Sequence, residues 1–101
     1  TAVSGSGPAY FFLVVEAMVA AGKELGLTAE IATELTVQTL IGAGKMLAES
    51  GSDAQTLRTN VTSPNGTTAA ALKVLQDGDI QELFKKALKA ARDRSHELAS
   101  G

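Results

Sequence analysis

The sequence predicts an all-α fold, a multi-helix domain with a long, buried first helix. Apolar residues recur at helical spacing along most of the chain, and turns rich in glycine and proline separate these stretches. No segment alternates apolar and polar residues as a half-buried strand does. Three of the four aromatic residues are consecutive (Tyr10, Phe11, Phe12), so most of the core must be aliphatic.

Composition narrows the class of protein further. The chain has 101 residues, the size of one domain, and its lack of cysteine excludes a disulfide scaffold and thiol catalysis. Nine Lys and Arg residues against eleven Asp and Glu residues leave no broad basic field, so we expect no nucleic-acid partner. The most apolar run, residues 8–21, is too short for a bilayer and contains Glu16. Without a secretory signal pattern, the expected location is the cytoplasm and no membrane association is expected.

The first helix is predicted over residues 8–25. It follows a glycine-rich segment, has Pro8 at its first position, where a missing N–H costs little, and ends before Gly26. Its apolar side chains cover almost every face, so burying them requires a surface from outside the chain. These side chains are Tyr10, Phe11, Leu13, Val14, Val15, Met18 and Val19.

The second helix is predicted over residues 29–49, with Thr28 as its N-cap. Gly42 and Gly44 each cost about 1 kcal/mol of helix propensity relative to alanine, so we expect close helix–helix approach there. The apolar stripe that identifies this helix comprises Val37, Leu40, Ile41, Gly44, Leu47 and Ala48.

Two shorter helices are predicted next. Ser52 with Gln55 forms a capping box for a short helix that extends to about Thr59. After turn formers in 60–68, a helix resumes at Ala69 and ends near Gly78.

The last helix is predicted to begin at Asp79, with Glu82 in the capping-box position. Its charged residues mostly lie on the face opposite its apolar stripe and are expected to be solvated. The stripe comprises Ile80, Leu83, Phe84, Ala87, Leu88 and Ala91.

Several apparent motifs do not fit their chemistry. Residues 42–45 end like a phosphate-binding loop, but Met46 replaces the required Ser or Thr and no strand precedes it. Residues 5–7 lack the third glycine of a dinucleotide fingerprint. His96 is the only histidine, so we expect no metal site and a solvated side chain. Glu16 has no second acid beside it and is expected at a rim or an interface.

The segment with chemical content runs from Thr62 to Thr68. The hydroxyls of Thr62, Ser63, Thr67 and Thr68 surround a Pro-Asn-Gly turn that leads into a helix. A helix N-terminus with such donors can bind a carboxylate or phosphate. The alternative from the residues alone is that the hydroxyls only cap the helix and shape the turn.

Four segments together resemble a known family. They are Ser4-Gly5-Ser6-Gly7-Pro8-Ala9-Tyr10, residues 42–47 (Gly-Ala-Gly-Lys-Met-Leu), residues 61–68 (Val-Thr-Ser-Pro-Asn-Gly-Thr-Thr) and residues 94–98 (Arg-Ser-His-Glu-Leu). The chain resembles the C-terminal domain of pyrroline-5-carboxylate reductase over essentially its whole length. The resemblance implies a helical domain that forms an interlaced homodimer, with a higher oligomer left open.

The resemblance also implies an activity and assigns cofactor binding and substrate binding to different domains. Enzymes of this family reduce 1-pyrroline-5-carboxylate to L-proline with NADPH or NADH in the last step of proline biosynthesis. Their N-terminal Rossmann domain binds the dinucleotide, so residues 1–101 are expected to provide dimerisation and substrate binding and no cofactor-binding residue.

The family's site residues transfer by position. Ser63, Gly66, Thr67 and Thr68 correspond to the loop that binds the substrate carboxylate, and Thr68 to the catalytic threonine near the ring nitrogen. Many relatives have glycine where this chain has Asn65, and Asn tolerates left-handed backbone angles, so we expect the loop to persist. Two alternatives stay open: a non-catalytic helical interaction module, or the dimer domain of a paralogous imine or ketone reductase.

Overall fold

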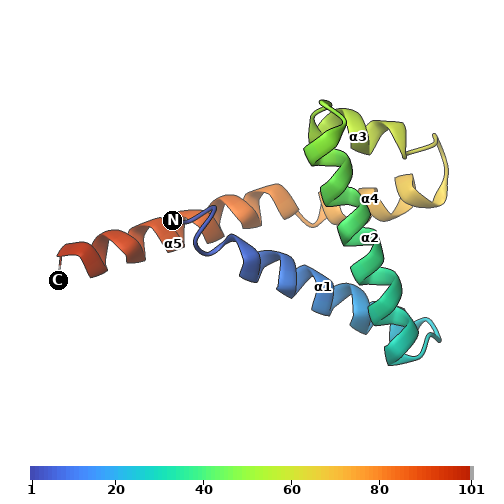
Figure 1. The fold of residues 1–101 in the computed structure, drawn as a ribbon, viewed down its shortest axis with the longest axis horizontal. Coiled ribbons are helices and arrows are strands. Elements are labelled where there is room, and N and C mark those ends of the chain that lie inside the picture. Colours follow the sequence, from blue (N-terminus) through green and yellow to red (C-terminus); the bar gives the residue numbers. More distant parts are fainter. Residues whose placement is uncertain (101) are drawn as a thin grey trace. The chain divides into compact units, whose positions relative to one another are not determined.

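A computed structural model describes residues 1–100, which form five α-helices and no strand (Figure 1). The all-α prediction is therefore confirmed. The helices are α1 (Gly7–Glu24), α2 (Ala29–Glu49), α3 (Ala54–Asn60), α4 (Thr67–Asp77) and α5 (Ile80–Ser100). The chain divides into two units: unit 1 comprises Thr1–Pro8 with the chain from Arg58 onward, and unit 2 comprises Ala9–Leu57.

Helices α1 and α2 approach each other closely in unit 2. A Cβ atom on Gly22 of α1 would lie 3.3 Å from the Cβ of Ala32 in α2, and Ala32 is only 2% exposed. The turn between these helices follows the prediction, since Gly26 has a φ of 106° and the Thr28 hydroxyl accepts from the Ile31 N–H at 3.2 Å. Glycine at position 22 thus permits a close contact between the two helices.

Gly42 and Gly44 do not make the close contact that their helix cost predicts. A Cβ atom on either glycine would meet nothing within 4 Å. Within unit 2, therefore, no other helix makes the expected close approach, and the approach stays a prediction. The helix itself has the predicted bounds.

Helix α3 begins at Ala54, and its cap differs from the prediction. The Asp53 carboxylate accepts from the Thr56 N–H at 2.8 Å, while the Ser52 N–H donates to the Ser50 hydroxyl at 3.2 Å. The Ser52 capping box is wrong because Asp53 is one residue nearer the helix and its charged oxygen is favoured at a helix N-terminus.

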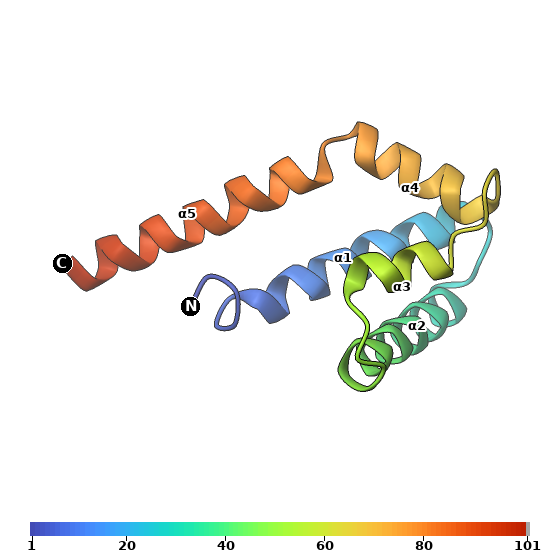
Figure 2. The same cartoon turned by 90° about the horizontal axis from the view of Figure 1, so that it is seen from above.

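Helices α4 and α5 follow one another in unit 1 and meet at an angle (Figure 2). α4 begins at Thr67, two residues earlier than predicted, so both threonines belong to its first turn. α5 begins at Ile80, next to the predicted start, but Asp79 has a φ of 58° and its side chain makes no capping bond among the described residues. This left-handed residue produces the change of direction between the two helices.

The described residues bury very little apolar side chain. Ala32 is the one buried hydrophobic residue, and Thr36 is the one buried polar residue. Consecutive aromatic and aliphatic side chains of α1 are exposed instead, to 59% at Phe11, 64% at Phe12 and 66% at Leu13. Unit 2 by itself therefore does not cover α1, in agreement with the all-round apolar pattern of this helix. No helix within residues 1–100 is long and apolar enough to cross a membrane.

Candidate functional site

The hydroxyl-bearing segment connects α3 to α4, and Thr62 fixes its start. The Thr62 hydroxyl donates to the Arg58 carbonyl at 2.6 Å, and the Thr62 N–H donates to the Thr59 carbonyl at 3.1 Å. The last carbonyls of a helix lack partners within the helix, so these bonds satisfy the end of α3. Among the four hydroxyl residues, Thr62 accordingly has a structural role.

The turn that follows has two conformational requirements. The Gly66 N–H donates to the Ser63 carbonyl at 3.0 Å, and Asn65 adopts a left-handed φ of 62°. A Cβ atom on Gly66 would lie 3.2 Å from the Ser63 carbonyl oxygen, which is tighter than an ordinary contact. The prediction that asparagine at position 65 accepts left-handed angles is confirmed, and the close approach to Ser63 favours glycine at position 66.

The N-terminus of α4 has no side-chain cap among the described residues. Its N-cap is Gly66, which offers no side-chain cap. Within residues 1–100, the N–H groups of Thr67, Thr68 and Ala69 have no hydrogen-bond acceptor, and the hydroxyls of Ser63, Thr67 and Thr68 make no hydrogen bond. The alternative that all these hydroxyls only cap and shape the turn is therefore not what the structure has. Fixed donors at the positive end of a helix suit a carboxylate or a phosphate.

The other sequence candidates do not assemble into a site. Glu16 and His96 are both exposed, and residues 1–100 contain no group of three or more His, Cys, Asp or Glu side chains suited to a metal ion. On α5, hydrogen bonds from Lys89 and Arg92 hold the pKa of the Asp93 carboxyl below its usual range. This is a solvated ion-pair network, with Lys89 Nζ at 2.9 Å from the carboxylate.

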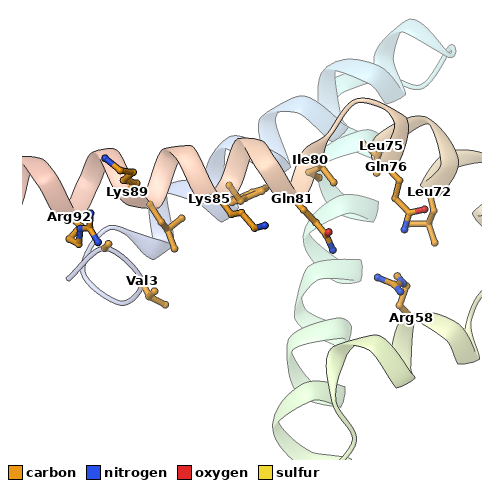
Figure 3. A pocket seen from close by; sticks show the side chains of 13 residues that line it. Val3, Arg58, Leu72, Leu75, Gln76, Ile80, Gln81, Lys85, Lys89 and Arg92 are labelled. Carbon is orange, nitrogen blue, oxygen red and sulfur yellow. The ribbon is translucent and has the colours of Figure 1, made fainter.

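A second feature, missed by the sequence patterns, is an open groove of about 1140 Å³ in unit 1 (Figure 3). Apolar residues of α4 and α5 form its floor, and Arg58 of α3 points toward Gln76 of α4. Arg58 of α3 and three cations of α5 line the groove together with apolar side chains. The three α5 cations are nevertheless largely exposed, in agreement with the predicted solvated face. The lining comprises Ala2, Val3, Arg58, Leu72, Leu75, Gln76, Ile80, Gln81, Phe84, Lys85, Leu88, Lys89 and Arg92. The long side chains of the cations explain how they reach apolar surface with their heads in water.

Comparison with known proteins assigns the chain to a family. Residues 1–98 match the family model described as pyrroline-5-carboxylate reductase dimerisation. The chain belongs to the pyrroline-5-carboxylate reductase dimerisation family. The family resemblance inferred from the sequence is thus confirmed over residues 1–98.

Relatives of this dimerisation domain are full-length reductases. The chain is 54% identical over 99 residues to the pyrroline-5-carboxylate reductase of Pseudomonas aeruginosa, covering 98% of this chain and 36% of that protein. It is 44% identical over 99 residues to pyrroline-5-carboxylate reductase 1 of Bacillus subtilis, covering 98% of this chain and 33% of the relative. The chain therefore spans about a third of the length of the curated relatives it matches.

Solved structures agree with this assignment. The pyrroline-5-carboxylate reductase of Coxiella burnetii superposes with a TM-score of 0.93 at 54% identity, covering 96% of this chain and 36% of that one. The Plasmodium falciparum pyrroline carboxylate reductase with NADP bound gives a TM-score of 0.90 at 37% identity, covering 94% and 36%. The five-helix dimerisation domain is thus the shared part of these longer proteins.

Proposed function

We propose that residues 1–101 are the dimerisation and substrate-binding domain of a pyrroline-5-carboxylate reductase. The enzyme reduces 1-pyrroline-5-carboxylate to L-proline with NADPH or NADH, the last step of proline biosynthesis. The observation that carries the proposal for this chain is the uncapped N-terminus of α4, with free donors at the residues to which the sequence resemblance assigns the substrate loop. A cytoplasmic location belongs to the proposal and rests on the absence of cysteine.

The substrate carboxylate binds at the start of α4 in this proposal. The N–H groups of Thr67 and Thr68 and the hydroxyl of Ser63 supply donors for its two oxygens. These donors are already fixed by the helix and by the Ser63–Gly66 bond of 3.0 Å, so binding requires little reordering. Gly66 keeps the turn close enough to the helix for the donors to converge.

Thr68 is the proposed catalytic residue. Reduction adds a hydride to the imine carbon, and the ring nitrogen then takes a proton to become the amine of proline. The Thr68 hydroxyl, which has no partner among the described residues, orients the ring nitrogen and relays this proton from water. Threonine is a weak acid, so a relay in which water replaces the proton that the neutral hydroxyl gives up, rather than donation that leaves a Thr68 alkoxide, fits its chemistry.

The nicotinamide cofactor supplies the hydride, but the described residues do not fit a dinucleotide. Residues 1–100 contain no strand, and a dinucleotide pyrophosphate binds at a glycine-rich turn between a strand and a helix. We assign that role to an N-terminal Rossmann domain of the complete reductase. A neighbour in structure, the Plasmodium falciparum enzyme, has NADP bound.

The proposed partner is a second copy of this chain, with a higher oligomer left open. The exposed apolar faces of α1 and the apolar groove of unit 1 need a cover. Unit 1 has seven Lys and Arg residues against five Asp and Glu residues, a formal charge of +2, whereas unit 2 has two against six, a formal charge of −4. Opposite charges favour pairing of unit 1 of one copy with unit 2 of the other.

Kinetics of the complete reductase test the proposed site. Thr68→Ala should lower kcat by roughly 10- to 1,000-fold, the scale of a lost polar catalytic contact. Ser63→Ala should mainly raise KM for pyrroline-5-carboxylate. Thr33→Ala is the matched control, because the Thr33 hydroxyl already bonds the Ala29 carbonyl at 2.8 Å on α2. Parental kinetics in both site variants would refute the assignment.

The two alternatives from the sequence make different kinetic predictions. A non-catalytic helical module has no reductase activity when joined to its neighbouring domain. A paralogous imine or ketone reductase prefers another substrate, so rates over a panel of cyclic imines and ketones identify it. The proposal expects pyrroline-5-carboxylate to give the highest kcat/KM in that panel.

A further inference from the structure

One hydroxyl of the loop segment differs from the other three. The Thr62 hydroxyl is committed to the Arg58 carbonyl at 2.6 Å, and Thr62 is half-buried. The remaining hydroxyls of the segment make no hydrogen bond within residues 1–100. Thr62 therefore cannot serve the ligand in the way that the free hydroxyls can, and its bond must serve the path of the chain.

A continuous series of bonds leads from α3 to α4 through Thr62. The Thr62 side chain and N–H bond the carbonyls of Arg58 and Thr59, at 2.6 and 3.1 Å. The next residue, Ser63, accepts from the Gly66 N–H at 3.0 Å, and Gly66 in turn accepts from the Ala70 N–H at 3.2 Å. In this series, the Thr62 hydroxyl is the one side-chain group, so it is the one link that a substitution can remove without changing the backbone.

We propose that Thr62 is the positioning residue of the substrate loop. Its hydroxyl bond to α3 sets the direction in which the chain enters the turn, and thereby the place of Ser63 relative to the free N–H groups of α4. This inference rests on the proposed function, because it takes those donors to be the carboxylate site. Thr62 does not touch the substrate and acts only through Ser63 and the turn.

The inference predicts a specific kinetic change. Losing one intramolecular hydrogen bond lets the turn sample other positions, so the donors converge less often and the substrate binds about 3- to 10-fold more weakly. The hydride and proton steps depend on the bound geometry that the substrate itself restores. KM for pyrroline-5-carboxylate should therefore rise, with kcat within about twofold of the parent and KM for NADPH unchanged.

Thr62→Val in the complete reductase is the main test, since valine keeps the shape and removes the hydroxyl. Thr62→Ser retains the hydroxyl and should restore KM. The control is Thr39→Val, which removes a bond of the same kind, from the Thr39 hydroxyl to the Leu35 carbonyl at 2.7 Å on α2. Thr62→Ala is the second variant should valine prevent folding, and thermal melts of every variant report folding separately from KM.

The outcomes separate this inference from the proposed function. If Ser63→Ala and Thr68→Ala impair catalysis while Thr62→Val keeps the parental KM, the substrate site stands and the positioning role is wrong. An equal rise of KM in Thr39→Val, or a failure of Thr62→Ser to restore it, also overturns the positioning role. Parental kinetics in Ser63→Ala and Thr68→Ala overturn both together. A rise of KM in Thr62→Val with rescue by serine supports the inference.

Discussion

Asn65 is the residue of the candidate loop that adopts a left-handed backbone conformation. Its φ of 62° lies in the left-handed region. This region costs most residues roughly 1–2 kcal/mol, but glycine lacks a Cβ and asparagine can form local hydrogen bonds there. Asn65→Gly should therefore keep the urea midpoint of unfolding, and Asn65→Val should lower the free energy of unfolding by about that amount. Asn60→Val, at the end of α3, is the control. Equal midpoints for the two valine variants would contradict a left-handed turn.

At the scale of single residues, the sequence allowed part of the site to be predicted. The tolerance of Asn65 follows from a local backbone preference, and the structure confirms it. The separate roles of Thr62 and Ser63 could not be predicted, because both carry hydroxyls in the same turn. Which hydroxyl bonds α3 depends on the geometry at the end of that helix, and only the 2.6 Å bond to Arg58 separates them.

Asp53 caps the N-terminus of α3, so the stability that this cap contributes should depend on pH. Hydrogen bonds from the Thr56 side chain and then from the Thr56 N–H hold the pKa of the Asp53 carboxyl below its ordinary 3.8. The unfolded chain binds the proton more readily, so this stabilisation is complete above pH 3.8 and is lost as pH falls below it. The difference in urea midpoint between the parent and Asp53→Ala should therefore be smaller at about pH 3 than at about pH 6.

Ser52→Ala is the matched control for that cap. The Ser52 hydroxyl makes no bond to α3 among the described residues, so this variant should have the parental midpoint at every pH. A large loss in Ser52→Ala, with none in Asp53→Ala, would restore the capping box predicted from the sequence.

At the scale of elements, helix positions were more predictable than helix ends. The period of apolar residues and the Thr28 cap predict the bounds of α2 as the structure has them. α4 starts two residues before its predicted start, because Thr67 and Thr68, which were assigned to the preceding turn, belong to its first turn. The first backbone hydrogen bond of α4 runs from the Ala70 N–H to the Gly66 carbonyl, at 3.2 Å. This bond places Thr67 and Thr68 inside the helix, and it could not be predicted from the two side chains.

Neither unit of the described chain has a core of its own, so a dimer is expected in solution. An obligate interface of this kind should bury more than about 2,000 Å² in total. Phe12→Asp places a charge on a side chain that is 64% exposed in one chain, so it should not disturb packing within the chain. It should dissociate and unfold the protein together in sedimentation and circular dichroism.

Gln38→Asp adds the same charge at an exposed polar position of α2 and should remain dimeric. A stable, folded monomer of the parent at micromolar concentration would contradict the dimer. The need for an outside surface was predicted from α1 alone, since its apolar residues cover almost every face. The groove of unit 1 was not predicted, because it combines residues of α3, α4 and α5 that are far apart in the chain.

The carboxylate site at the start of α4 is best tested by titrating the 101-residue chain with L-proline and following its amide chemical shifts. We expect weak, saturable shifts centred on Ser63, Gly66, Thr67 and Thr68, because the donors at the start of α4 are free. NADPH should give no saturable shifts, since residues 1–100 lack the strand-to-helix turn that a dinucleotide requires. Proline shifts that map elsewhere would rule out this site, and saturable shifts with NADPH would rule out the assignment of dinucleotide binding to another domain.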